Sequence, residues 1–245
     1  MDFLKEWIIQ IDFDEGRFDF LSAGTTPIAA WGECLPFEYD RDGGVRVMAT
    51  VGASAQGRFL VDTGKFGGND LVDVLFSRLS KSQEIRVTGD LESVAFTGGY
   101  VSQNGRLSRL SLGPFQHENI RVTCSNQNRL SLAYLRRYRL TFDFPGQQLY
   151  LAKGRRYAEP DRGSTCGVGL LFKPDRIEVG HINEKGPAYA AGVRKNDVLV
   201  EVNDTPVSAL KPSEIHNLLT AEGKPVHIGR NRPPRRGRQP ASAAG

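Results

Sequence analysis

The sequence predicts a mainly β protein in two parts, a closed β unit over about the first 150 residues and a small α/β domain after it. Short stretches that alternate apolar and polar residues, separated by glycine-rich turns, fill the first part. From about Arg155 the composition becomes polar and turn-rich, and a second compact pattern follows. The first 20 residues also recur near the middle of the chain, which is typical of a duplicated structural unit.

The repeat aligns Met1–Phe20 with Leu132–Leu151 without a gap. The two copies share an Asp-Phe pair and the spacing of their large apolar residues, so that Leu4 aligns with Leu135, Trp7 with Tyr138, Ile9 with Leu140, and Phe18 with Leu149. We interpret the shared Asp12 and Asp143 as structural residues of closing strands. The second copy closes a unit, whereas no such unit precedes the first. We therefore expect residues 1–25 to be the closing segment of a first lobe whose body is absent from this sequence.

The next elements are expected in residues 26–154. Val45–Val51 alternates as a half-buried strand does, and the apolar run Phe59–Val61 leads directly into Asp62, so the two form a hairpin. Asp70–Leu79 carries apolar residues at a helical period. Further strands are expected where alternation returns, at Glu84–Val87, Ser93–Phe96, Leu107–Leu112 and Ile120–Val122.

The second part of the chain divides into three segments. Residues 155–163 form a linker, and residues 164–231 are long enough for one small domain with strands at Ile177–Ile182 and Asp197–Val202. Residues 232–245 are rich in Pro, Gly, Ala and Arg, a composition that predicts a disordered basic tail.

Composition excludes several functions. Of the 245 residues, 39% are hydrophobic and 24% charged, and no run of 18 apolar residues could span a membrane. The net charge is +4, but five arginines lie at positions 230, 232, 235, 236 and 238, and 4 − 5 leaves −1 for the rest. Because no aromatic residues interleave with them, nucleic acid is not an expected partner.

No metal or cofactor is expected either. Cys34, Cys124 and Cys166 form no C-x-x-C pair, and the four histidines, at positions 117, 181, 216 and 227, stand without neighbours at ligand spacing.

The motif Asp62-Thr63-Gly64 ends an apolar strand and is followed by a predicted helix and by the closing segment Leu130–Tyr138. Together these residues resemble the retropepsin-like aspartic proteases, bacterial members in particular, over about Val45–Leu151, with Met1–Leu21 as the tail of a preceding copy. The resemblance implies a closed β-barrel of the acid-protease type. It makes Asp62 one half of a catalytic pair, with Thr63 joining the two motifs and Gly64 allowing close backbone approach. It also places a substrate-covering flap at Gly98, Gly99 and Tyr100, just after Phe96-Thr97.

A single Asp-Thr-Gly cannot supply the two carboxylates that share a proton in such a site. The second comes either from a missing N-terminal lobe or from a homodimer, and the repeat favours the lobe. The chain departs from the family pattern at Lys65, where Ala or Ser is usual, and at Ser131, where Gly is common. Lys65 either lies beside Asp62 and favours its charged form, or points to solvent.

Gly186–Val193 followed by Lys195–Val207 resembles a PDZ domain of the kind appended to bacterial envelope proteases. The resemblance implies a site for the C-terminus of a peptide at Gly167, Val168, Gly169 and Leu170, with the Ser213–Leu219 helix, and His216 on it, forming the other wall. It also implies an envelope, periplasmic or secreted location.

We therefore expect an aspartic-type endopeptidase that hydrolyses a polypeptide substrate with an Asp dyad and uses its PDZ domain for peptide capture or regulation. The 245-residue chain alone should have little activity. The alternative is a catalytically inactive retropepsin-like/PDZ scaffold that binds peptides.

Overall fold

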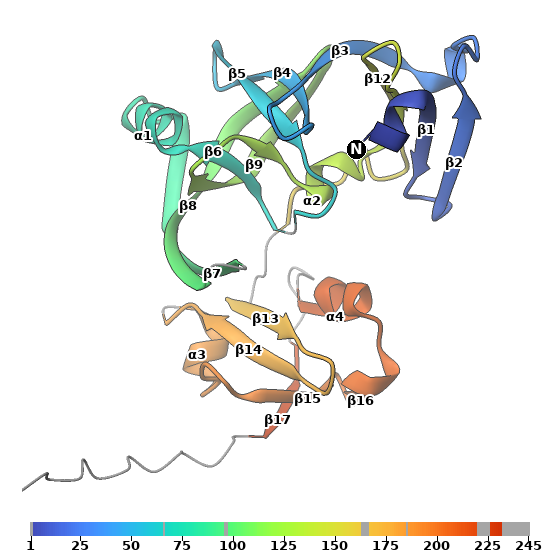
Figure 1. Ribbon diagram of the computed structural model, residues 1–245. Helices are drawn as coiled ribbons and strands as arrows, with labels where there is room; N and C mark the ends of the chain where they lie inside the picture. The colour runs from blue at the N-terminus through green and yellow to red at the C-terminus, as the bar shows by residue number, and fades with distance from the viewer. Residues whose placement is uncertain are drawn as a thin grey trace, which may run out of the picture. The chain divides into compact units, whose positions relative to one another are not determined.

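A computed structural model describes residues 2–65, 67–95, 98–162, 167–184, 186–219 and 226–231. The chain folds as two compact units, Met1–Asp161 and Arg162–Gly245, here called the barrel unit and the C-terminal unit (Figure 1). The expected tail 232–245, Cys166 and the flap residues Phe96 and Thr97 lie outside the described residues. In the described part of the chain, no helix combines the length and apolar character needed to cross a membrane.

The barrel unit is built mainly from strands, with short helices between them. Its strands are β1 (Trp7–Asp12), β2 (Arg17–Ser22), β3 (Glu33–Tyr39), β4 (Val45–Val51), β5 (Ala55–Val61), β6 (Asn69–Val72), β7 (Ile85–Ala95), β8 (Gly98–Leu112), β9 (Phe115–Ser125), β10 (Arg129–Leu130), β11 (Tyr138–Asp143) and β12 (Gln148–Lys153). Its helices are η1 (Asp2–Glu6), η2 (Ala29–Trp31), α1 (Asp73–Lys81) and α2 (Leu132–Leu135).

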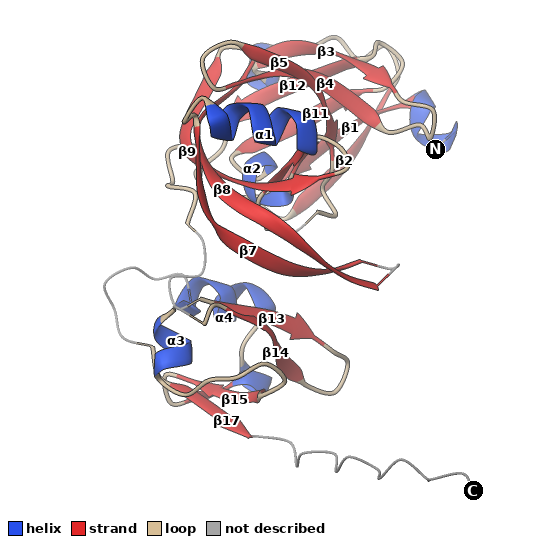
Figure 2. Ribbon diagram, turned by 90° about the vertical axis from the view of Figure 1, so that its left-hand side faces the viewer, coloured by secondary structure: helices blue, strands red, loops and turns tan. Residues whose placement is uncertain are grey.

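Six strands close into a barrel, in the order β4, β5, β10, β6, β9, β8, with β8 pairing back to β4 (Figure 2). Two neighbours in this ring are parallel, β5 with β10 and β6 with β9, and the others are antiparallel. Five of the remaining strands continue from β4 as β3, β12, β11, β1 and β2, and β7 pairs with β8 on the other side of the ring. The expectation of a mainly β fold with a closed barrel is confirmed.

Alternation located β4 and the β4–β5 hairpin correctly, because β4 buries every second residue. The expected helix Asp70–Leu79 is wrong in its first turn. Asp70 belongs to β6, which pairs with β9, and the helix begins only at Asp73. Leu71 is fully buried in that strand, whereas Val74, counted among the apolar positions of the helix, is exposed. The two strands expected at Glu84–Val87 and Ser93–Phe96 fall, as far as the structure describes them, on one longer strand, β7, which runs from Ile85 to Ala95.

The barrel is filled by one continuous apolar cluster. Phe59 of β5, Leu71 of β6, Phe76 of α1 and Leu130 of β10 are all buried in it, together with residues of β4, β8, β9 and β11. Burial on this scale is the main source of stability in such a fold. The strands that lead to Asp62 therefore end in a tightly packed core.

The two copies of the sequence repeat form equivalent hairpins. Hairpin β1–β2 and hairpin β11–β12 have equal lengths and equal registers, with Trp7 opposite Ser22 in one and Tyr138 opposite Lys153 in the other. Each turn is held by the repeated aspartate. Asp12 accepts backbone N–H groups of Asp14 and Glu15, and Asp143 accepts that of Gly146. Asp12 and Asp143 thus have the structural role that their place in the repeat indicated.

Residues 23–32 carry the chain from β2 past β11 and β12 to β3. Trp31 packs against the ring of Tyr150, and Gly32 has a φ of 85°. A Cβ at Gly32 would lie 2.1 Å from the carbonyl oxygen of Leu151, so only glycine fits this passage over β12.

The C-terminal unit is a small sheet with helices. It contains β13 (Val168–Phe172), β14 (Ile177–Ile182), α3 (Pro187–Ala190), β15 (Val198–Val202), β16 (Thr205–Pro206), η3 (Val207–Ala209), α4 (Pro212–Leu219) and β17 (Ile228–Asn231). The sheet order is β13, β14, β15, β16, with β17 also on β15. Leu170 of β13 and Ile215 of α4 belong to one apolar cluster, so β13 and α4 pack together.

A buried histidine makes the barrel unit sensitive to acid. His117 of β9 shares a 2.6 Å hydrogen bond with the Tyr138 hydroxyl. Burial first, and then the charge of Arg137, lower the pKa of His117 from 6.5 to about 4. Between these values the unfolded chain binds more protons than the folded one, so the free energy of unfolding falls as the pH falls.

We expect a loss of about 2 kcal/mol between pH 7 and pH 4.5 from this group, discounted for partial solvent access. Urea unfolding at the two pH values measures it, with His117→Gln as the control that cannot titrate. An equal pH dependence in the variant and the parent chain would contradict this assignment.

Candidate active site

Asp62 is positioned by the strand that ends just before it. β5 runs parallel to β10, with Val61 opposite Leu130. The Asp62 backbone N–H donates to the Leu130 carbonyl oxygen at 3.1 Å, and the Leu60 N–H donates to that of Asn128 at 3.0 Å. The backbone of Asp62 is therefore fixed at the edge of the packed core.

The turn after Asp62 orients its carboxylate. The Gly64 N–H donates to Asp62 Oδ1 at 3.0 Å, and the Lys65 N–H donates to the Asp62 carbonyl oxygen at 3.2 Å. The Asp62 side chain remains 31% exposed, and Thr63 is exposed. A Cβ at Gly64 would lie 3.4 Å from Asp62 Oδ1, an ordinary contact, so the packing against Asp62 does not by itself require glycine there.

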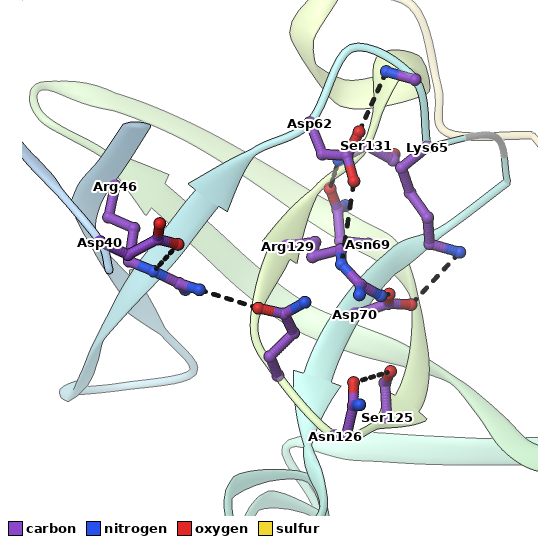
Figure 3. Close-up of polar contacts among 12 residues, drawn as sticks. Asp40, Arg46, Asp62, Lys65, Asn69, Asp70, Ser125, Asn126, Arg129 and Ser131 are labelled. Atoms are coloured by element: carbon purple, nitrogen blue, oxygen red, sulfur yellow. Dashed lines mark hydrogen bonds and ion pairs between the residues drawn. The ribbon is translucent and has the colours of Figure 1, made fainter. Parts of the chain in front are cut away.

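Two cations and a second aspartate surround Asp62 (Figure 3). Arg129 of β10 donates from Nη1 to Asp70 Oδ2 at 2.8 Å, and its Nε lies 3.8 Å from Asp62 Oδ2. Lys65 places Nζ 3.3 Å from Asp70 Oδ1. The Asp70 side chain is only 2% exposed, so a buried carboxylate holds both cations. We call Asp62, Lys65, Asp70 and Arg129 the charge cluster.

Lys65 does not simply point to solvent, the second arrangement that the sequence left open. Its ammonium group forms an ion pair with Asp70 of β6, and its side chain is only 23% exposed. Arg129 is a second cation near Asp62, with its Nε 3.8 Å from Asp62 Oδ2. The charge at this site therefore depends on Asp70, which divides its two oxygens between Lys65 and Arg129.

Ser131 does not prevent the close approach of β10 to the motif strand. Ser131 is fully buried, and its backbone N–H donates to the Asn69 side-chain oxygen at 2.9 Å. The Leu132 N–H donates to the Lys65 carbonyl oxygen at 2.9 Å. Asn69 thus joins β6 to the segment that follows β10.

Asp70, Arg129 and Asn69 are the residues of this site that sequence reasoning missed. Asp70 and Asn69 were hidden because they are polar residues in a short buried strand, which has no apolar alternation to reveal it. A signal was nevertheless present. A strand of the core that contains an aspartate requires a cationic partner, since an unpaired buried charge is very costly.

The expected flap residues lie in a long hairpin. Gly98, Gly99 and Tyr100 begin β8 and pair with Ala95, Val94 and Ser93 of β7. The pairing of β8 with β9 starts only at Asn104, so the outer part of the hairpin extends beyond β9, as Figure 2 shows. A break in register between Val87 and Gly89, where Gly89 has a φ of 141°, falls at the same level. This bulge separates the hairpin into an inner part within the barrel and an outer ribbon.

The expected peptide site of the C-terminal unit lies on an edge strand. Val168, Gly169 and Leu170 belong to β13, which pairs only with β14 among the described strands, with a break in register between Gly169 and Leu170. Gly167 precedes the strand with a φ of 77°. α4 contributes Ile215 to the cluster that Leu170 joins, whereas the side chain of His216 lies outside what the structure describes.

The described His, Cys, Asp and Glu side chains, the residue types that commonly bind metal ions, do not gather into a metal site. Within the described ranges, no group of three or more His, Cys, Asp or Glu side chains could hold an ion. Cys34 and Cys124 are free thiols. Burial, and next the neighbouring Asp73, raise the pKa of Cys124.

Comparison with known proteins identifies the C-terminal unit. The family model for the PDZ domain matches residues 178–229, so the expected PDZ domain is confirmed. The chain is also similar to a solved retropepsin-like aspartic protease from Rickettsia conorii. The two share 18% sequence identity with a TM-score of 0.36, over 49% of this chain and 88% of that one. No curated protein sequence matches the chain. Likeness at this level assigns no role to any residue.

Proposed function

We propose that the barrel unit is one catalytic lobe of an aspartic-type endopeptidase and that Asp62 is one of its two catalytic carboxylates. The observation that carries the proposal is the setting of Asp62. An Asp-Thr-Gly turn follows a buried barrel strand, a backbone amide binds one carboxylate oxygen, and the side chain stays accessible. This arrangement fixes the carboxylate and leaves it open to a substrate.

The chemistry requires a second carboxylate close to Asp62. Two such groups share one proton, because both cannot be charged at short distance. The ionised member takes a proton from water, which attacks the peptide carbonyl carbon, while the protonated member donates to the carbonyl oxygen. The carboxyl group that took the proton from water then passes it to the amide nitrogen, and collapse of the tetrahedral intermediate breaks the C–N bond and releases an amine and a carboxylic acid. Thr63 would join the two motifs.

The outer ribbon of β7 and β8 is the candidate flap. Gly98, Gly99 and Tyr100 lie at its far end, and the bulge at Gly89 is where it leaves the barrel. Among the described residues, no atom lies within 4 Å of a Cβ placed at Gly89, so these surroundings leave this point room to bend. Closure of the ribbon over a bound polypeptide would exclude water from the reaction.

The PDZ domain is proposed to bind a peptide by adding it to the edge of β13. Its C-terminal carboxylate would meet the backbone amides near Gly167, Val168 and Gly169. This would capture substrate or regulate the barrel unit.

The charge cluster favours a second candidate function, a catalytically inactive scaffold that binds peptides. Arg129 lies 3.8 Å from Asp62, and a cation beside two carboxylates opposes the sharing of one proton. Asp70 acts against this effect by accepting the stronger bond from Arg129.

Activity can be measured in two forms of the protein. The 245-residue chain alone should cleave an unfolded protein at acidic pH very slowly. A tandem protein, in which a copy of residues 26–131 precedes Met1, would supply a second Asp-Thr-Gly and should cleave faster. In the tandem protein, Asp62→Asn in the original lobe, or the same substitution in the added copy, should then reduce cleavage by about 100-fold or more.

A pepstatin-type inhibitor provides the control, since it imitates the tetrahedral intermediate and binds a competent pair. If the tandem protein folds, yet neither cleaves substrate nor binds this inhibitor, the scaffold function stands in place of the protease.

Asp70 should be essential for stability because it neutralises two partly buried cations. Asp70→Asn should lower the free energy of unfolding by about 3 kcal/mol, measured by urea unfolding at pH 7. The exposed pair Arg17–Asp19 offers a matched control, and Asp19→Asn should cost less than about 1 kcal/mol. Similar costs for both variants would show that the charge cluster is not a coupled unit.

Peptide capture by the PDZ domain is tested with fluorescent peptides that end in an apolar residue. We expect a peptide with a free carboxylate to bind the full chain about 10-fold or more tightly than the same peptide with an amidated C-terminus, because charged hydrogen bonds to the carboxylate are lost. Equal affinity for both forms, or binding of neither across a peptide library, would contradict this role.

A further inference from the structure

We propose that η1, β1 and β2 form the docking surface for a second barrel lobe, which precedes Met1 in a longer polypeptide. The surface consists of the free edge of β2 and an aromatic face made by Phe3, Trp7, Phe18 and Phe20. In this proposal, hairpin β1–β2 closes the preceding lobe as hairpin β11–β12 closes this one. The inference rests on packing and does not require Asp62 to be catalytic.

The pairing of the two hairpins is symmetric. β1 pairs with β11 so that Gln10 lies opposite Thr141, and these two residues occupy the same position in the repeat. Gln10 Nε2 donates to Thr141 Oγ1 at 2.8 Å. On either side, Ile9 lies opposite Phe142 and Ile11 lies opposite Leu140. In the repeat, Ile9 aligns with Leu140 and Ile11 with Phe142, so replacing each residue by its aligned counterpart turns one pair into the other. A local two-fold axis therefore passes between Gln10 and Thr141, and it relates the two hairpins.

The two hairpins differ in burial, because apolar side chains of the first copy are exposed where those of the second copy are buried. Phe3, Phe18 and Phe20 are 63%, 52% and 48% exposed, whereas their counterparts Tyr134, Leu149 and Leu151 are at most 2% exposed. The exposed rings contact one another and Trp7 at centroid distances of 5.1 to 6.2 Å. The same positions that face a barrel core in the second copy thus form an uncovered aromatic cluster in the first.

A polar atom at this face indicates the same missing neighbour. Trp7 Nε1 is buried and has no hydrogen-bond partner among the described residues. Its counterpart Tyr138 uses its hydroxyl to bond His117, which belongs to β9 of the barrel that β11 closes. A second lobe would bring its own β9 to Trp7 and could supply the acceptor.

The edge of β2 completes the argument. β12 pairs on one side with β11 and on the other with β3, where Leu149 lies opposite Leu35. β2, its counterpart, pairs with β1 and with no other described strand, and Figure 1 shows the hairpin at the side of the barrel unit. The two-fold axis predicts that a strand equivalent to β3 pairs with β2, with its Leu35 counterpart opposite Phe18.

A second copy of this chain does not fit the surface. In such a copy β3 is already paired with its own β12, so it has no free edge to offer β2. The occupant must be a barrel without a closing hairpin of its own. A lobe encoded directly before Met1 meets this condition. It would be closed by β1–β2, just as the barrel of residues 33–130 is closed by β11–β12.

The tandem protein described above tests the docking surface without reference to activity. We expect the backbone amides of β2 to exchange with solvent hydrogen about 100-fold more slowly in the tandem protein than in the 245-residue chain, as amides of a central strand do. In the tandem protein, Phe18→Lys with Phe20→Lys should restore fast exchange in β2 and leave β11 and β12 protected.

Unchanged exchange of β2 in a tandem protein whose added lobe is otherwise protected would overturn the proposal. So would a stable dimer of the 245-residue chain, seen by light scattering and abolished by the same two substitutions, since the face would then belong to a second copy. Protection of β2 without peptidase activity would support the docking surface and count against the catalytic function alone.

Discussion

The architecture of the barrel unit depends on the pairing of β8 with β4, which closes six strands into a ring. Closure leaves β10, only two residues long, between β5 and β6. That short strand carries Arg129, and its Leu130 carbonyl oxygen accepts the N–H of Asp62, so the same strand positions the carboxylate and a cation beside it. A shift in barrel packing would move the Asp62 carboxylate and the Arg129 guanidinium together, so the rigid scaffold keeps the distance between them constant.

The charge cluster and the aromatic face present opposite physical problems. In the cluster, a buried carboxylate would be very unfavourable alone and is compensated by Lys65 and Arg129 within the same unit. On the aromatic face, large apolar rings lie in water with no compensation inside the described chain. The charge cluster thus pairs its charges within the barrel unit, whereas the aromatic face lacks a surface to cover it among the described residues. This contrast is why we assign a structural and electrostatic role to Asp70 but an interaction role to Phe18 and Phe20.

Local patterns revealed what depends on local sequence. The alternation of Val45–Val51 predicted β4, the sequence repeat marked both closing segments, and ordered motif residues predicted the PDZ domain. The strand at Asn69–Val72 was missed because two partners of its polar residues, Arg129 and Ser131, lie 59 or more positions away in the sequence. The symmetric register of β1 and β11 was also beyond reach, since a repeat shows that two segments are alike and not that they pair with each other.

The order of strands also determines when the barrel unit can fold during synthesis. Ile8 pairs with Asp143 and Leu35 with Leu149, so strands made early must wait for strands made late. Contacts of such long sequence separation slow folding, because the chain must close large loops before it gains those contacts. Until Lys153 leaves the ribosome, both early strands keep open edges in a crowded solution. The PDZ domain, whose pairings lie close in sequence, has no such delay, and a nascent chain would depend on chaperones for its first part more than for its last.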